Sequence, residues 1–207
     1  MLTADTVDRA FRRMDLSFEF SEEDRKPPIT IPVVTDACRV LGFPTPRANE
    51  NLNILNLRRL CGVDPQRPPS FFDHPWYLAE TFGLTDCTPG WHFIQMDVPN
   101  DSLEQSHDYC HRLSDQGLTL PTAIEVVLML FLHFVETGER LLLKKHTWCQ
   151  DSASLGRFVT VGAFGRNGVF VSGHPGTFAS RGLGICGKYI EGEIPNPKRL
   201  QIDAPCH

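Results

Sequence analysis

Two short stretches combine histidine with cysteine at the spacing of metal ligands: HDYCH, which begins at His107, and HTWC, which begins at His146. Two histidines four residues apart on an α-helix point to the same side, so His107 and His111 can bind one zinc ion. His146 and Cys149 would complete a closed site, although residues three apart on a strand face opposite sides unless a bulge intervenes. Zinc at these four residues is one hypothesis, and a buried cysteine between partly exposed histidines is the alternative.

Motifs of other enzyme classes are incomplete. The HExxH motif of zinc proteases has glutamate directly after its first histidine, whereas Asp108 follows His107. The stretch GLGICG, which begins at Gly182, matches GxGxxG, but a dinucleotide fingerprint also needs a βαβ unit and an acidic residue ~20 positions further on. The stretch lies too near the C-terminus for such a unit. We therefore expect a glycine-rich crossing in which backbone packs on backbone.

Two cysteines are candidates for nucleophilic catalysis, namely Cys149 and Cys186, with His146 or His174 as a possible base. A reactive thiol needs a neighbour that lowers its pKa and access to the substrate. Neither cysteine lies in a recognised catalytic motif. Reduced, structural thiols are the alternative, so the catalytic residues stay unknown at this point.

The segment RPPSFFDHPWY, residues 67–77, is rich in aromatic side chains. Aromatic residues and arginine are enriched at the energetic centres of protein interfaces. We therefore predict that Phe71, Phe72, Trp76 and Tyr77 contact a protein partner. In the alternative interpretation they cover the hydrophobic core under a long loop, and the sequence does not distinguish these two arrangements.

A nucleic-acid alternative rests on the segment NLNILNLRRL, residues 51–60. Arg58 and Arg59 would meet phosphates if the short helices of this region formed a helix-turn-helix. The formal net charge of −5 provides no overall basic surface for nucleic acid. The apolar residues of the segment favour packing in the core, so nucleic acid is the weaker alternative.

Composition indicates an ordinary globular protein. Apolar residues make up 41% and charged residues 22% of the 207 residues, which argues against disorder. The seven cysteines are scattered without a CxxC pair, and no secretory signal is recognisable, so we expect reduced thiols and a cytoplasmic location. The longest apolar run, residues 126–135, is too short to span a bilayer, and no membrane partner is expected.

The N-terminal half is predicted to be mainly helical. Residues 1–26 are expected to form an amphipathic helix, over 3–16, and an exposed charged linker. A single α+β domain over 27–190 and an extended or disordered tail over 191–207 complete the chain. The first part of the domain is predicted to contain three short helices, at 32–41, 51–61 and 75–82, with C-caps at Gly42, Gly62 and Gly83.

The second part of the domain combines helices with a small antiparallel sheet. A strand is predicted at 90–98, and a capping box of Ser102 and Gln105 predicts a helix over 103–116. The helix predicted at 121–136 is apolar almost all round and must be the buried centre. Three strands follow at 140–149, 157–164 and 169–172, and Asn167-Gly168 predicts a hairpin between the last two. Segregated helices and strands indicate the α+β class.

The leading functional hypothesis is a non-enzymatic accessory protein that works through protein–protein contacts and needs no cofactor. The alternative is a zinc-binding protein or a Cys/His-based enzyme centred on His107, His111, His146 and Cys149. A second alternative is nucleic-acid binding through Arg58 and Arg59.

Overall fold

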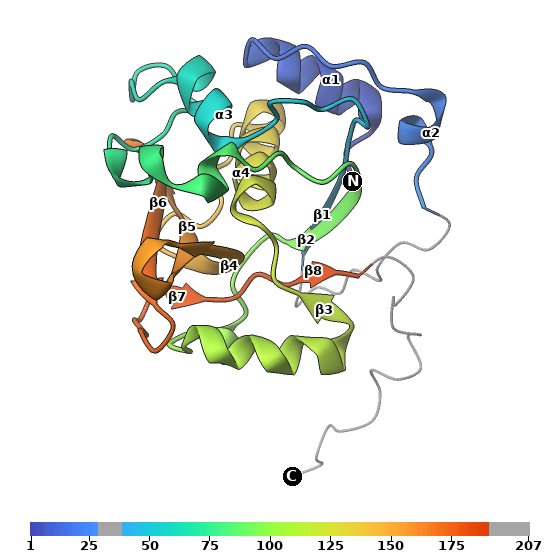
Figure 1. Cartoon of the computed structure of the whole chain (residues 1–207). Helices are drawn as coiled ribbons and strands as arrows, with labels where there is room; N and C mark the ends of the chain where they lie inside the picture. Colours follow the sequence, from blue (N-terminus) through green and yellow to red (C-terminus); the bar gives the residue numbers. More distant parts are fainter. Residues whose placement is uncertain (29–38, 191–207) are drawn as a thin grey trace.

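The computed structural model describes residues 1–28 and 39–190 (Figure 1). Helices occur together with antiparallel and mixed sheets, which confirms the predicted α+β class. The two four-stranded sheets have the strand orders β1-β2-β8-β3 and β6-β5-β4-β7. Helix α4, Ala123–Thr137, contacts strands of both sheets and therefore lies at the centre of the fold. Within the described ranges, no helix is long and apolar enough to cross a membrane.

Helix α4 forms where the sequence predicts the buried central helix. Thr122 and Glu125 form a capping box at its start, and Gly138 ends it in the left-handed conformation. The residues from Ala123 to His133 are all buried. The helix is apolar on every side because strands and helices pack on every side of this part of it.

The N-terminal helices precede the first strand. Helix α1, Ala4–Arg13, follows the cap residue Thr3 and buries the apolar stripe that its periodicity predicts. The prediction of an exposed linker after it is wrong in part, because Glu22–Arg25 form helix α2 and Asp24 is buried. The Asp24 carboxylate accepts hydrogen bonds from the backbone N–H and the hydroxyl of Ser21. The sequence suggests that Asp24 is a solvent-exposed charge, but its carboxylate is buried and forms part of the N-terminal cap of α2.

Short helices fill much of the segment between α2 and α4. Helix α3, Ile54–Cys61, confirms the helix predicted at 51–61. The others are 3-10 helices: η1 at Pro75–Ala79, η2 at Thr81–Leu84, η3 at Asn100–Ser102 and η4 at His107–Gln116. The helix predicted at 75–82 is thus present as two short 3-10 segments.

The α-helix predicted over 103–116 is wrong in type and in its start. Glu104 has a positive φ of 61°, and η4 begins only at His107. Ser102 does not form a capping box with Gln105: its hydroxyl oxygen accepts from the N–H of Ile185 at 3.1 Å, and its proton goes to the carbonyl of Pro99. A 3-10 helix turns about 120° per residue, so positions i and i+4 lie about 120° apart, against about 40° in an α-helix.

The first sheet consists of β1, Val40–Thr45, β2, Gly90–Gln95, β3, Leu118–Thr119, and β8, Lys188–Tyr189. The predicted helix over 32–41 is wrong at its C-terminal end, because β1 begins at residue 40; residues 32–38 lie outside the described ranges. Gly42 does not act as a helix cap. It pairs with Phe93 on β2, and a Cβ at Gly42 would lie 2.6 Å from the Phe93 ring. Glycine therefore leaves room for a ring across the strand pair.

The second sheet consists of β4, His146–Ala153, β5, Arg157–Gly165, β6, Gly168–Pro175, and β7, Leu183–Gly184. A short 3-10 turn, η5 at Ser154–Gly156, connects β4 to β5. Gly165 pairs with Gly168, which confirms the predicted hairpin. The strand predicted at 140–149 begins only at residue 146, because Leu142 has a positive φ of 50° and the chain turns there. The predicted tail lies outside the described residues.

Candidate metal site

The four metal ligands predicted from the sequence do not form one group of ligand atoms among the described residues, although the His107 ring reaches the backbone of Cys149. His107 stacks on Phe158 with ring centroids 3.6 Å apart, whereas His111 is exposed and its Nδ1 contacts the carbonyl of Asp108. The two imidazoles diverge because η4 is a 3-10 helix, in which the i, i+4 spacing no longer places them on one side. Their separation removes the argument on which the zinc hypothesis for HDYCH depended.

The other two predicted ligands lie on β4 and point to opposite sides, as their spacing on a strand requires. His146 contacts the ring of Phe170, and Cys149 is fully buried. Burial, together with the nearby His174, lowers the pKa of His146 to about 4, so this imidazole is neutral at neutral pH. Burial raises the pKa of the Cys149 thiol, so it is not poised as a nucleophile.

A different group of possible ligands is assembled at the start of α4. Among the described residues, Cys87, His92 and Glu125 each offer a ligand atom, and these atoms lie within 4.8 Å of one another. All three side chains are buried. Cysteine, histidine and glutamate are ligands that zinc accepts, so this group could hold a metal ion.

Three separate elements position this group. His92 lies on β2, where alternation places it on the same side as Ile94, and both are buried. Glu125 lies in the first turn of α4, and its Oε2 accepts a hydrogen bond from the Thr122 N–H at 2.9 Å. Cys87 lies in the connection before β2, where its N–H donates to the carbonyl of Leu52. The site therefore depends on packing between β2, its preceding loop and α4.

The imidazole of His92 lies between the carboxylate and the thiol. Its Nδ1 is 3.2 Å from Oε1 of Glu125, which is the distance of an ion pair. On the other side of the ring, Nε2 lies 3.0 Å from the Thr45 hydroxyl, 3.0 Å from the Thr88 carbonyl and 4.0 Å from Sγ of Cys87. One ring nitrogen therefore faces a hydroxyl, a carbonyl and the thiol, and the other faces the carboxylate of Glu125.

A lysine also reaches the carboxylate. The Nζ atom of Lys188, on β8, donates to Oε1 of Glu125 at 2.6 Å. Burial by itself raises the pKa of Glu125, but His92 and the Lys188 ammonium outweigh burial and lower it to about 2. Burial, reinforced by the charge of Glu125, raises the pKa of the Cys87 thiol. Without a metal ion, the site thus contains a carboxylate, an ammonium and a neutral thiol.

Two residues of the Cys87–His92–Glu125 group stand out in the sequence. A histidine on the apolar side of a strand and a glutamate in an otherwise apolar helix are both exceptions to the usual distribution of buried residues. His92 and Glu125 are such exceptions. The sequence does not show that these residues meet, because β2 and α4 are separated by the η3, η4 and β3 segments.

The glycine-rich stretch GLGICG is a backbone crossing, as predicted. A Cβ at Gly182 would lie 2.6 Å from the carbonyl oxygen of Lys144, and one at Gly184 would lie 2.7 Å from that of Ser102. β7 runs through the stretch, and no helix follows it within the described residues. Cys186, in the same stretch, is buried.

The predicted partner-binding residues divide between the core and the surface. Phe71 and Tyr77 are buried, whereas Phe72 is 37% exposed. Trp76 is partly buried, and its Nε1 donates to the Val171 carbonyl at 2.7 Å. Phe71 and Tyr77 therefore contribute to folding, and only Phe72 and Trp76 are accessible to a partner.

The two arginines of the nucleic-acid alternative are both engaged within the chain. Arg58 forms an ion pair with Asp73 at 3.0 Å and donates to the Tyr77 hydroxyl at 3.2 Å. Arg59 donates to the side chain of Asn56, one turn earlier in α3. These contacts position the segment 72–77 against α3.

Comparisons with known proteins give no relative from which function could be transferred. No protein-family model matches the chain, and no curated protein and no solved structure is significantly similar to it.

Proposed function

We propose that the protein binds a zinc ion through Cys87, His92 and Glu125. The observation that supports this most directly is the convergence of three ligand types that zinc accepts in one buried place. The short contact between Nδ1 of His92 and Oε1 of Glu125, at 3.2 Å, supports it further, because two atoms of the kinds that bind zinc already lie next to each other. A buried ion joining β2 to α4 would stabilise the fold, as structural zinc does.

Zinc binding would be an exchange of cations. The Lys188 ammonium occupies the position next to Oε1 of Glu125 that a metal ion would take. Its side chain is 21% exposed and can turn towards solvent, whereas the carboxylate is 1% exposed and stays in place. Binding would also release the thiol proton of Cys87, because zinc takes the thiolate. We therefore expect zinc affinity to rise with pH.

Metal analysis of the purified protein tests this proposal. Chain purified after expression with zinc is expected to retain about one zinc ion per chain, and Cys87→Ser is expected to lose it. Lys188→Met removes the competing charge and is expected to raise zinc affinity at least about tenfold. Competition with a chromophoric chelator measures both variants.

Cys61→Ser is the matched control, because Cys61 is partly buried and lies on α3, outside the group. It is expected to bind zinc like the original chain. Folded protein that takes up no zinc, even as Lys188→Met, would refute the proposal. The Cys87–His92–Glu125 group would then be a hydrogen-bonded structural network only.

A protein-binding surface is the second candidate function, and exposed leucines support it. Leu155 is 90% exposed, Leu84 65% and Leu78 47%. Glu80 lies between η1, which carries Leu78, and η2, which carries Leu84. Its carboxylate accepts a hydrogen bond from the N–H of Ser154 at 2.9 Å, which places the neighbouring Leu155 beside these two short helices. Clustered apolar side chains on a surface are typical of a protein contact.

The surface extends to one of the aromatic residues predicted to bind a partner. The guanidinium of Arg157 lies over the Trp76 ring, 5.5 Å from its centroid. Tryptophan and arginine are among the residues that contribute most to binding at interfaces. We refer to Trp76, Leu78, Leu84, Leu155 and Arg157 as the leucine surface.

Loss of binding by the double variant Leu78→Asp/Leu155→Asp tests the leucine surface. Both side chains are exposed, so the variant is expected to fold while the surface becomes charged. A partner protein is first captured with the original chain, identified and purified. This partner is expected to bind the variant at least about tenfold more weakly than the original chain. Leu143→Asp, at a leucine that is 57% exposed elsewhere, is the control. Equal binding by all three chains would contradict this second function.

A further inference from the structure

The second sheet turns one side to the main core around α4. Val159, Val161 and Val171 belong to that core. Because side chains alternate along a strand, the residues between them point to the other side, which we call the outer face. The outer face carries His146 and Trp148 from β4, Phe158 and Thr160 from β5, and Phe170, Ser172 and His174 from β6.

Helix η4 and the loop after β6 lie over part of the outer face. Phe178, in the loop, stacks on His174 with ring centroids 4.3 Å apart. The N–H of His107, the first residue of η4, donates to the carbonyl of Gly176 at 3.0 Å, so the helix and the loop are joined. We refer to η4 and residues 176–180 as the cover.

The cover rests on a small hydrophobic cluster of its own. Six buried side chains form this cluster, in which Leu113 of the cover packs with Trp148 of the outer face. The cluster is separate from the main core around α4. We therefore expect the cover to open at a lower free energy than the whole fold, because its opening exposes only the small cluster.

Two histidines at the contact between the cover and the outer face are held neutral. Burial lowers the pKa of His107 and that of His174 below the ordinary value of 6.5. The Arg157 guanidinium, on β5, lowers the pKa of His174 further. At His107, the neighbouring Asp108 and the backbone of Cys149 oppose the effect of burial without cancelling it.

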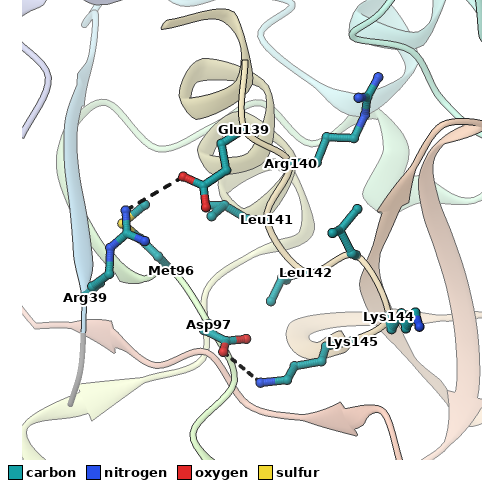
Figure 2. A pocket seen from close by; sticks show the side chains of 10 residues that line it. Arg39, Met96, Asp97, Glu139, Arg140, Leu141, Leu142, Lys144 and Lys145 are labelled. Atoms are coloured by element: carbon teal, nitrogen blue, oxygen red, sulfur yellow. Dashed lines mark hydrogen bonds and ion pairs between the residues drawn. The ribbon is translucent and has the colours of Figure 1, made fainter. Parts of the chain in front are cut away.

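His146, also on the outer face, has no counter-ion. Lys145, the residue before it, lines the pocket that Figure 2 shows and pairs there with Asp97 at 2.7 Å. On the outer face, burial and the charge of His174 lower the pKa of His146. His74, in the segment before η1, contacts the same phenylalanine ring as His146 and supplies no negative charge.

The other two buried histidines differ, because each faces a carboxylate. Nδ1 of His92 lies 3.2 Å from Oε1 of Glu125, and Nε2 of His133 lies 3.1 Å from Oε2 of Glu139. Within residues 1–28 and 39–190, no carboxylate forms such a pair with the three histidines described above. Those three therefore cannot take up a proton without loss of stability while the cover is closed.

We propose that the cover is an acid-sensitive switch, which opens at mildly acidic pH when the histidines between it and the outer face become protonated. A histidine whose pKa is lower in the closed form than in the open form binds more protons in the open form. The closed form therefore loses stability as the pH falls below about 6.5, before most carboxylates titrate. Opening would expose Trp148, which is fully buried in the closed form.

Hydrogen exchange measured by mass spectrometry at about pH 7.5 and about pH 5 tests the switch. After correction for the pH dependence of the chemical exchange rate, we expect the amides of the cover to exchange at least about tenfold faster at the lower pH. The amides of α4 are the internal reference and are expected to stay protected. The change is expected to reverse when the pH is raised again.

Two histidines of η4 give a matched comparison. His107→Phe keeps a ring that can stack on Phe158 but cannot be protonated, so the acid response is expected to be at least about threefold smaller. His111→Phe, at an exposed position of the same helix, is expected to respond like the original chain. His174→Gln is a second test variant, because its amide can still bond to the hydroxyl of Ser172.

Three results would overturn the proposal. The first is an unchanged exchange rate of the cover at about pH 5. The second is equal loss of protection in the cover and in α4, which would mean global acid unfolding. The third is an acid response in both test variants that equals the response of the original chain.

Discussion

Replacing Glu125 with alanine is expected to lower the free energy of unfolding by about 3–5 kcal/mol, the range for removing one partner of a buried ion pair. The side chain is 1% exposed and serves two neighbours at once: Oε1 accepts from Lys188, and Oε2 accepts from the N–H of Thr122. Its loss leaves an ammonium that is 21% exposed without a counter-charge and uncaps the first turn of α4. Urea unfolding followed by circular dichroism measures the change.

Two further variants separate the charge from the cap. Glu125→Gln keeps an oxygen that can accept from Thr122 but removes the negative charge, so a smaller loss is expected. Adding Lys188→Met to Glu125→Ala is expected to recover part of the stability, since no unpaired cation then remains. Glu50→Ala, at an exposed position, is the control. A loss below about 1 kcal/mol for Glu125→Ala would mean that the ion pair and the cap contribute little.

The second large effect is expected at Gly162, where alanine should cost about 3 kcal/mol or more. A Cβ at this position would lie 2.2 Å from the carbonyl oxygen of Lys145 and 2.7 Å from Cα of His146. Both are backbone atoms, so a change of side-chain rotamer cannot relieve the contact. The variant is therefore expected to separate β4 from β5 locally, which thermal unfolding and proteolysis would detect.

Gly165→Ala is the matched control on the same strand. The nearest atom to a Cβ there is the carbonyl oxygen of Ala163 at 3.7 Å, which is ordinary van der Waals contact. We expect this variant to stay within about 1 kcal/mol of the original chain. Similar stability of the two variants would contradict the close approach of the Lys145 carbonyl to β5.

Elements whose signals lie within a few residues were predictable from the sequence. Helix α4 has a capping box, a C-terminal glycine and a continuous apolar sequence, and the β5–β6 hairpin has Asn167-Gly168 at its turn. These signals act through local backbone conformation and through burial of the element's own side chains. They are therefore readable before any tertiary contact is known.

Two errors have a common cause. The sequence pattern predicts a helix cap at Gly42, but the residue leaves room for Phe93 on the next strand. The capping box at Ser102 is not formed, because that hydroxyl oxygen accepts from the N–H of Ile185, far along the chain. In both cases a residue with a local signal is used by a distant segment, and tertiary contacts outweigh local propensity.

Sequence by itself determined the α+β class, the buried central helix and the set of histidines, cysteines and glutamates from which a site can be built. Only the tertiary structure decided which of them meet. The 3-10 geometry of η4 separates His107 from His111, and the packing of β2 against α4 brings His92 to Glu125. Ligand spacing along a chain specifies a site only if the helix type is known, and contacts between elements depend on how the whole core packs.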